Sequence, residues 1–211
     1  MAVAHALWTF KLLIAKNAAP TLLETLMGFS LGVIIGCAFA IVLDAFDGIK
    51  RWFLPAFIAS QAIPTFAIAP LLIMWLGYGF SSKILVTLLM LFFPIASSLY
   101  DGLQRTPQAY LDLAYTMKTK RLTLLCYIKL PAALPSLGAG LRVAATIAPM
   151  GAIIGEWVGA SQGLGFLMLN ANARMQIDLV FAVLFVIIAM ALLLYYAVDA
   201  LVKKMLFWKP S

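Results

Sequence analysis

Long uncharged stretches alternate with short charged segments along this chain, and the stretches have the length needed to cross a membrane. Four of them hold between 17 and 31 residues without a charge, namely 25–43, 52–82, 84–100 and 179–198. A helix that spans a bilayer needs about 20 mainly apolar residues. The pattern therefore predicts four spanning helices.

Residues 134–157 predict a fifth span, because they are apolar apart from Arg142 and Glu156 near opposite ends. We expect Arg142 to extend its charged group to the membrane interface, and pairing with a carboxylate such as Asp112 is the alternative. Residues 157–173 also lack charge, but their Gly, Ser, Gln and Asn residues predict a loop and a short helix that lie outside the hydrocarbon core or are buried in protein. The chain is thus predicted to be an all-α polytopic membrane protein with about five transmembrane helices.

Composition agrees with this fold class and narrows the function. Hydrophobic residues make up 64% of the chain and charged residues 11%, which excludes an ordinary water-soluble enzyme. No phosphate-binding loop, catalytic pair or metal-ligand cluster is recognisable, and the single His5 stands alone, so we expect no cofactor, no metal and no ATP hydrolysis by this chain. The net charge of +7 is better explained by its distribution over loops than by nucleic-acid binding.

The positive charges are unequally divided between the two predicted sides of the membrane. One side carries ten, which are Lys50, Arg51, Arg105, Lys118, Lys120, Arg121, Lys129, Lys203, Lys204 and Lys209. The other carries four, which are Lys11, Lys16, Lys83 and Arg174. Because cytoplasmic loops are enriched in Lys and Arg, the ten-charge side and the C-terminus are predicted to be cytoplasmic. Residue 1 then lies outside, which predicts either insertion with the N-terminus out or a preceding span missing from this sequence.

Small and polar residues within the spans suggest how the helices pack and what they surround. We predict close helix contacts at two stripes of glycine with a spacing of four, Gly28, Gly32 and Gly36 in the first span and Gly151 and Gly155 in the fourth. Ser60, Gln61 and Pro64 lie in a proline-bent span and are candidates to line a translocation path, with helix-to-helix hydrogen bonding as the alternative. Glu156 is interpreted either as an outer gate or as an interfacial carboxylate bonded to nearby backbone.

The least membrane-like segment, residues 101–135, predicts two short helices that project into the cytoplasm. The first covers 107–118, with Thr106 as N-cap and Pro107 at the first helical position. The second covers about 120–130 and stops at Pro131. A merely solvated basic loop would not explain the ordered pattern from Leu130 to Pro135.

This segment resembles the EAA loop of binding-protein-dependent ABC importer permeases. Asp112-Leu113-Ala114, three residues, Lys118 and then Leu130-Pro131 follow the family order of Glu-Ala-Ala, three residues, Gly and Leu-Pro. Lys118 replaces the family glycine, which normally permits a backbone conformation that other residues resist. Further matches to the branch that imports sulfonates, taurine, nitrate and thiamine pyrimidine precursors are Gly28 to Gly32, Ile63-Pro64, Trp75-Leu76-Gly77, Ser82-Lys83-Ile84, Phe93-Pro94-Ile95, Gly140-Leu141-Arg142, Gly155-Glu156 and Gly163-Leu164-Gly165-Phe166.

The resemblance covers about residues 7–208 and implies a MetI-like permease fold that lacks the usual first span. It implies a homodimer in the bacterial inner membrane, a separate cytoplasmic ATPase and an external solute-binding protein. Asp112, Ala114, Lys118, Leu130 and Pro131 would form the surface that couples to the ATPase. The stretch 170–178 looks most like permeases for hydroxymethylpyrimidine-type precursors. A secondary transporter or channel, or a membrane scaffold without a transport path, remains the alternative class.

Overall fold

The computed structural model describes residues 2–60 and 62–207, and the regular elements in these ranges are helices. Gln61 and Lys209, both named above, lie outside the described residues. The elements are α1 (Ala2–Thr9), α2 (Lys11–Ala45), α3 (Asp47–Ser60), α4 (Thr65–Leu76), α5 (Phe80–Gln104), α6 (Gln108–Thr116), α7 (Arg121–Leu124), the π-helix η1 (Leu125–Lys129), α8 (Leu130–Gly159), α9 (Leu164–Ala173) and α10 (Ile177–Met205).

Five spans follow from these helices. α2, α5, α10 and the continuous stretch Arg121–Gly159 are each long and apolar enough to cross a membrane. α3 and α4 together form a fifth span that bends by 102° at the break between them. The predicted all-α fold with about five spans is confirmed, and α9 with the loop before it matches the short helix expected within 157–173.

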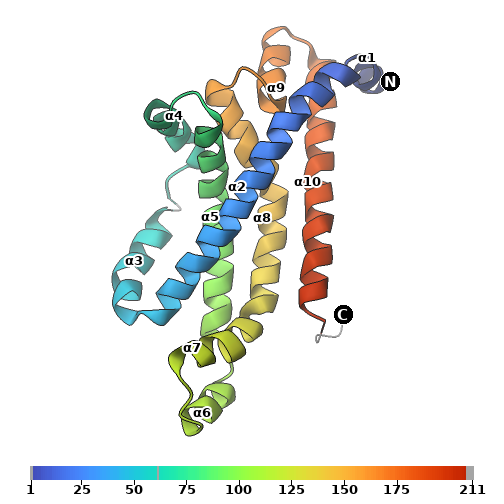
Figure 1. Ribbon diagram of the computed structural model, residues 1–211. Coiled ribbons are helices and arrows are strands. Elements are labelled where there is room, and N and C mark those ends of the chain that lie inside the picture. Colours follow the sequence, from blue (N-terminus) through green and yellow to red (C-terminus); the bar gives the residue numbers. More distant parts are fainter. Residues whose placement is uncertain (1, 61, 208–211) are drawn as a thin grey trace.

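The long helices run side by side and give the molecule two ends (Figure 1). α6 and α7 project at one end, where the described chain also finishes, and we call this the α6 end. α1, α4 and α9 lie at the opposite end, called here the α9 end. An odd number of spans therefore separates the two termini of the described chain.

The span boundary predicted from charge was wrong at Glu24, whereas Lys83 does lie near the start of a span. α2 continues for 35 residues, with Glu24 well inside it, and Lys83 lies in the first turn of α5. Each charge neutralises the other, because Lys83 Nζ lies 2.8 Å from Glu24 Oε1. A paired charge does not need to reach the membrane surface, so Glu24 can lie inside α2 without ending the span.

α5 forms the centre of the bundle, between α2 and α8. Its apolar face contributes Leu91, Ile95, Leu99 and Leu103 to the main core, and all four are fully buried. Small residues complete this core from the flanking helices, including Ala40 on α2 and Ala144 and Ala148 on α8. Large side chains on α5 therefore fill the space opened by small side chains on its neighbours.

Both glycine stripes face α5. A Cβ added at Gly32 would lie 3.3 Å from the Leu91 Cβ, and one at Gly151 would lie 2.9 Å from the Thr87 Cα. At Gly155 the Lys83 Cα would be 3.0 Å away. Distances to backbone atoms this short leave no room for a side chain, so the glycines set how closely α8 approaches α5.

Replacing Gly151 by Leu is expected to lower the free energy of unfolding by about 1–3 kcal/mol, because the new side chain must displace the α5 backbone. Thermal unfolding of the purified protein in detergent measures this loss. Gly48→Leu is the matched control, since no atom lies within 4 Å of a Cβ added at Gly48. Equal stability of the two variants would contradict a packing role for Gly151.

The outward faces of the spans are rich in apolar side chains. Large hydrophobic residues on α2 and α10 are exposed, among them Leu12, Leu23, Ile34, Leu193 and Tyr196. Such a surface is unfavourable in water. It is favourable in the apolar interior of a bilayer, where exposed apolar side chains contact lipid tails.

Arg142 does not meet Asp112, so the alternative of an ion pair with that carboxylate was wrong. Its Nε lies 2.7 Å from Asp199 Oδ1 on α10, and Lys203 Nζ lies 2.8 Å from the other oxygen of the same carboxylate. The ion pair joins α8 to α10 toward the α6 end. Asp199 was treated as the boundary of a span, so its role as a partner for Arg142 was overlooked.

Candidate functional site

The α6 end carries a projecting segment, residues 105–129, which we call the knob. α6 begins after Pro107, whose extended ψ of 133° makes it the N-cap instead of the first helical residue. Thr106 was expected to be the N-cap, but its hydroxyl donates to the Leu103 carbonyl at the end of α5. The cap was misassigned because Thr106 lies closer to the preceding helix than to the following one.

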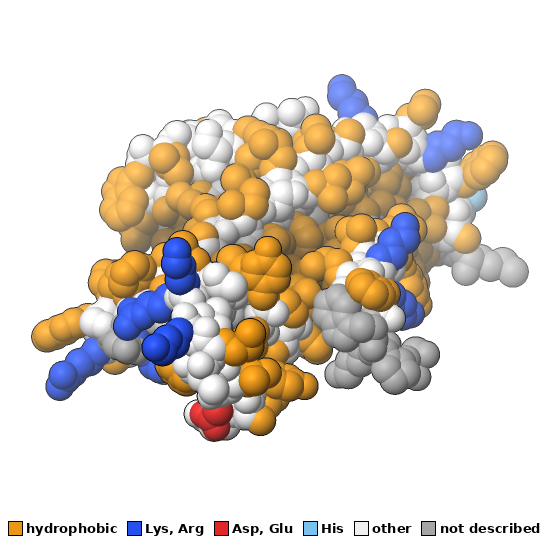
Figure 2. Space-filling model, turned by 60° about the horizontal axis from the view of Figure 1, so that its bottom comes forward, with side chains coloured by type: hydrophobic (Ala, Val, Ile, Leu, Met, Phe, Trp, Pro, Cys, Tyr) orange, Lys and Arg blue, Asp and Glu red, His pale blue; other side chains and the backbone are white. Residues whose placement is uncertain are grey.

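Apolar side chains are exposed on the knob even though charged residues surround it. Six of them have exposed fractions between 55% and 79%, namely Tyr110, Leu113, Tyr115, Met117, Leu122 and Tyr127. Figure 2 shows Lys and Arg side chains gathered beside apolar ones over this end of the molecule. A cationic border excludes the lipid interior, so the apolar surface is typical of a protein-binding site.

Asp112 lies exposed on α6 within this surface. Its carboxylate accepts a hydrogen bond of 3.0 Å from Gln108 Nε2, one turn earlier on the same helix. Ala114, two residues later, is only 2% exposed, and its carbonyl accepts the Thr119 amide at 3.0 Å. The Ala114 side chain is thus buried, whereas Asp112 faces outward.

Lys118 occupies a left-handed backbone position at the end of α6. Its φ is 52°, and its amide donates to the Tyr115 carbonyl while the Thr119 amide donates to Ala114. This pair of bonds is the Schellman ending, in which the position of Lys118 favours glycine. The turn therefore keeps the shape that a glycine would give it, at a conformational cost of about 1 kcal/mol.

Replacing Lys118 by Gly is expected to keep transport activity and to stabilise the knob by up to about 1 kcal/mol, because glycine adopts positive φ without strain. Hydrogen exchange of the α6 amides measures the change. Met175, with φ 58° at the end of α9, provides a matched control far from the knob, since Met175→Gly should leave α6 exchange unchanged. Faster exchange or lost activity in Lys118→Gly would show that the lysine side chain makes a contact of its own.

The second predicted helix does not stop at Pro131. α7 passes into η1 and then into α8, so one helical stretch runs from Arg121 to Gly159. Leu130 donates its amide to the Leu125 carbonyl, five residues back, and Pro131 has no amide to donate. Pro131 follows directly on this π-helical turn and the helical stretch continues through it, while Leu130 packs against the main core. The prediction gave Pro131 the role of a terminator, which it lacks at this position.

The residues predicted to line a path lie at the break in the bent span. Ser60 ends α3, where its hydroxyl donates to the Phe57 carbonyl at 2.6 Å, and Pro64 is the N-cap of α4. Both are exposed. Gln61, the third candidate, lies outside the described residues. The break makes a polar interruption in an otherwise apolar span.

Glu156 lies near the α9 end but is 1% exposed. One carboxylate oxygen accepts the Gly165 amide, and the other accepts the Thr21 hydroxyl. Thr21 also accepts the Leu164 amide at 2.8 Å, and Asn17 Oδ1 accepts the Gly163 amide at 2.9 Å. Side chains from α2 and α8 therefore satisfy three successive amides at the start of α9, where a negative charge is favoured. Of the two interpretations of Glu156, this geometry favours the bonded carboxylate.

A buried ion pair lies next to this cap. Glu24 is completely buried and bonded to Lys83, whose side chain is 10% exposed, and the Glu24 and Glu156 carboxylates lie close enough to interact electrostatically. Among the described residues, Glu24 Oε2 is a buried oxygen without a hydrogen-bond partner. A cavity of about 310 Å³ borders the pair and is lined by Tyr78, Phe80 and the residues after α8.

Residues 28–207 match the family described as binding-protein-dependent transport system inner membrane component. The chain belongs to this family. It is therefore a transport permease of the ABC importer class and not an enzyme, and the alternative of a secondary transporter loses its support.

Two permeases illustrate how similar this family member is to known relatives. A probable ABC transporter permease protein of Haemophilus influenzae is 48% identical over 203 residues, which cover 96% of this chain and 83% of the relative. The formylaminopyrimidine transport permease protein ThiX of Halalkalibacterium halodurans is 35% identical over 185 residues, which cover 88% of this chain and 74% of the relative.

The solved structure of the MetNI methionine ABC transporter in an inward-facing conformation contains a chain with the same fold. Its TM-score to this permease is 0.81, over 93% of this chain and 98% of that one, with 18% sequence identity. The likeness confirms the predicted MetI-like fold.

The sequence reasoning missed the polar residues that join the helices at the α9 end. Asn17, Thr21 and Glu24 repeat at intervals of four and three residues in an otherwise apolar stretch. That spacing places them on one helix face and could have indicated a shared buried site. Their partners Lys83 and Gly163 lie too far along the chain for any local pattern to reveal.

Proposed function

We propose that this permease imports a thiamine-type pyrimidine precursor with energy from a separate ATPase. The α6 end faces the cytoplasm and the α9 end faces outward. Nine of the ten positive charges assigned to the cytoplasmic side lie in described residues, and they belong to α3 and to the segments from α5 onward that meet at the α6 end. In the proposed orientation the C-terminus lies on the cytoplasmic side of a bacterial inner membrane.

The knob is the proposed docking surface for the ATPase. The observation that carries this assignment is the exposed apolar surface around Asp112, since it lies at the charged end of the molecule where lipid cannot cover it. Asp112 and the turn at Lys118 shape that surface, Ala114 is buried within the knob, and Leu130 and Pro131 begin α8, where Leu130 packs against the main core. In this proposal the permease forms the translocation path, and the separate ATPase hydrolyses ATP.

The remaining partners follow from the same orientation. A solute-binding protein docks at the α9 end, and two copies of the permease form a homodimer with one path between them. The break at Ser60 and Pro64 contributes polar groups to that path, because neutral polar side chains at membrane depth are favourable where they face a polar solute. The glycine stripes keep α2 and α8 close to α5 during transport.

The substrate assignment draws on the stretch 170–178 and on the 35% identity to a formylaminopyrimidine permease. Sulfonate, taurine and nitrate are the other solutes of this branch, and a taurine permease of Escherichia coli is 28% identical over 193 residues. Specificity is shared with the external binding protein, so the permease sequence carries only part of it.

Uptake of labelled hydroxymethylpyrimidine and of labelled taurine tests the proposal in cells that express this chain with the ATPase and binding protein encoded beside it. We expect pyrimidine uptake that exceeds taurine uptake at least tenfold. Taurine uptake alone would overturn the substrate and keep the importer class. Uptake of neither solute, with no ATPase retained on the purified chain, would overturn the coupling proposal.

A further inference from the structure

Both ends of the knob are tied to a single carboxylate on another helix. Asp44, in the last turn of α2, has a side chain that is only 4% exposed. Lys129 Nζ, at the exit of the knob, lies 2.9 Å from each of its two oxygens. Gln104 Nε2, at the end of α5 where the knob begins, donates to Asp44 Oδ1 at 2.8 Å.

The same set of bonds reaches the bent span. Lys50 on α3 donates to Gln104 Oε1 at 3.2 Å, so the amide of Gln104 connects α3 with Asp44. Asp44, Lys50, Gln104 and Lys129 thus form one polar cluster, which we call the junction. It connects α2 and α3 with both ends of the knob. Hydrogen bonds to a charged acceptor in a mostly buried site are stronger than neutral ones, so this junction resists separation.

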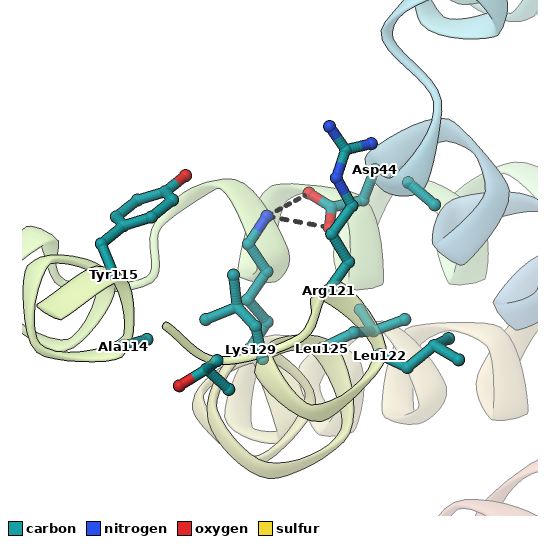
Figure 3. A pocket seen from close by; sticks show the side chains of 10 residues that line it. Asp44, Ala114, Tyr115, Arg121, Leu122, Leu125 and Lys129 are labelled. Atoms are coloured by element: carbon teal, nitrogen blue, oxygen red, sulfur yellow. Dashed lines mark hydrogen bonds and ion pairs between the residues drawn. The ribbon is translucent and has the colours of Figure 1, made fainter. Parts of the chain in front are cut away.

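The knob has room to move on this junction. A cavity of about 340 Å³ lies between it and α2, lined by Asp44 and Lys129 on one side and by Ala114 and Tyr115 on the other (Figure 3). Lys129 itself ends η1, a π-helical turn of five residues. π-Helical turns are rare and are frequently found at functional sites, and here the turn lies between the projecting helices and the spanning part of α8.

We propose that Asp44 is a positioning residue that transmits movement of the knob to α2 and α3. A push on α6 or α7 moves Lys129 and Gln104 together, because both are bonded to one carboxylate. Asp44 then carries the displacement into α2, and Gln104 and Lys50 carry it to the start of the bent span at whose break Ser60 and Pro64 lie. The inference rests on the proposed function, since it assumes that an ATPase acts on the knob.

The test uses the complete transporter, with ATPase and binding protein, reconstituted in liposomes with ATP hydrolysis and solute uptake measured on the same sample. The variants are Asp44→Asn, Lys129→Gln, the exchange Asp44→Lys with Lys129→Asp, and Gln104→Leu, which alters an exposed residue and leaves the ion pair intact. Lys203→Gln is the matched control, because it removes a lysine from an exposed ion pair at the same end of the molecule.

Asp44→Asn and Lys129→Gln are expected to reduce the number of solutes imported per ATP hydrolysed at least tenfold, while the ATPase stays bound and hydrolysis changes less than twofold. Gln104→Leu should lower this ratio by a smaller factor. The charge exchange should recover part of it, because Gln104 can turn its amide oxygen toward the ammonium group introduced at position 44. Lys203→Gln should leave the ratio unchanged.

An unchanged ratio in Asp44→Asn and Lys129→Gln would overturn the transmission role. So would a loss of uptake and hydrolysis in equal proportion, because that result indicates only poorer assembly. Failure of the wild-type chain to retain the ATPase would instead overturn the proposed function and with it the basis of this inference, so the two failures are distinguishable.

Discussion

Replacing Lys83 by Met is expected to lower the free energy of unfolding by about 3–5 kcal/mol, the range measured when one partner of a buried ion pair is removed. The substitution removes the cation of α5 from the space between α2, α5 and α8. The carboxylates of Glu24 and Glu156 then remain buried near each other without a positive partner. Loss of secondary structure on heating the protein in detergent measures the effect.

A second variant, which replaces Glu24 in addition to Lys83, tests more sharply whether the stability is lost through unpaired buried charge. Glu24→Gln with Lys83→Met should recover most of the lost stability, because the excess buried negative charge disappears with the lysine. Lys203→Met, in an exposed ion pair, should hardly alter the unfolding temperature. If Lys83→Met unfolds at the wild-type temperature, or if Glu24→Gln makes that variant less stable, the pair does not hold the helices together as described.

Reversing the charge of Asp112 with Lys is expected to abolish uptake, by at least a hundredfold, while membrane insertion and thermal stability stay close to wild type. Asp112 is exposed on α6 beside the apolar side chains of Tyr110 and Leu113, so Lys would place a cation inside the proposed interface with the ATPase without disturbing the fold. Solute uptake and retention of the ATPase on the purified chain measure the two effects.

Asp112→Glu is the matched control, since the resembling EAA pattern has Glu at this position. It should retain uptake within a few-fold and keep the ATPase bound. Normal uptake by Asp112→Lys would mean that this face of α6 does not contact the ATPase, whereas equal loss in both variants would point to the length of the side chain and not its charge.

The number of spans could be predicted from the sequence because each helix must supply enough apolar length on its own. The ends of the spans could not, because a charge inside the membrane is stable when a distant partner neutralises it. Glu24 with Lys83 and Arg142 with Asp199 are separated by 59 and 57 residues, and nothing local to either residue identifies the other. Considered without its partner, each of these charged residues would be taken for the end of a span. Considered with its partner, it forms an ion pair that joins two helices.

The structure of the knob could likewise be predicted only in part from the sequence. Its position, its first helix and the replacement of glycine by Lys118 could be read from the order of residues, and the turn has the backbone conformation that the pattern requires. The end of its second helix could not, because a proline does not always stop a helix, and the helical stretch from Arg121 to Gly159 continues through Pro131 after a π-helical turn. Asp44 escaped notice for another reason, since it serves the knob from a helix that ends about 60 residues before it.

The measurement that tests the central claim most directly is solute uptake into proteoliposomes that contain this permease with its ATPase and binding protein, with and without ATP on the side of the knob. The account predicts uptake that requires ATP on that side and disappears with Asp112→Lys. Uptake that proceeds without ATP and follows an imposed proton gradient would contradict it, because the energy would then enter through the membrane and not through the knob.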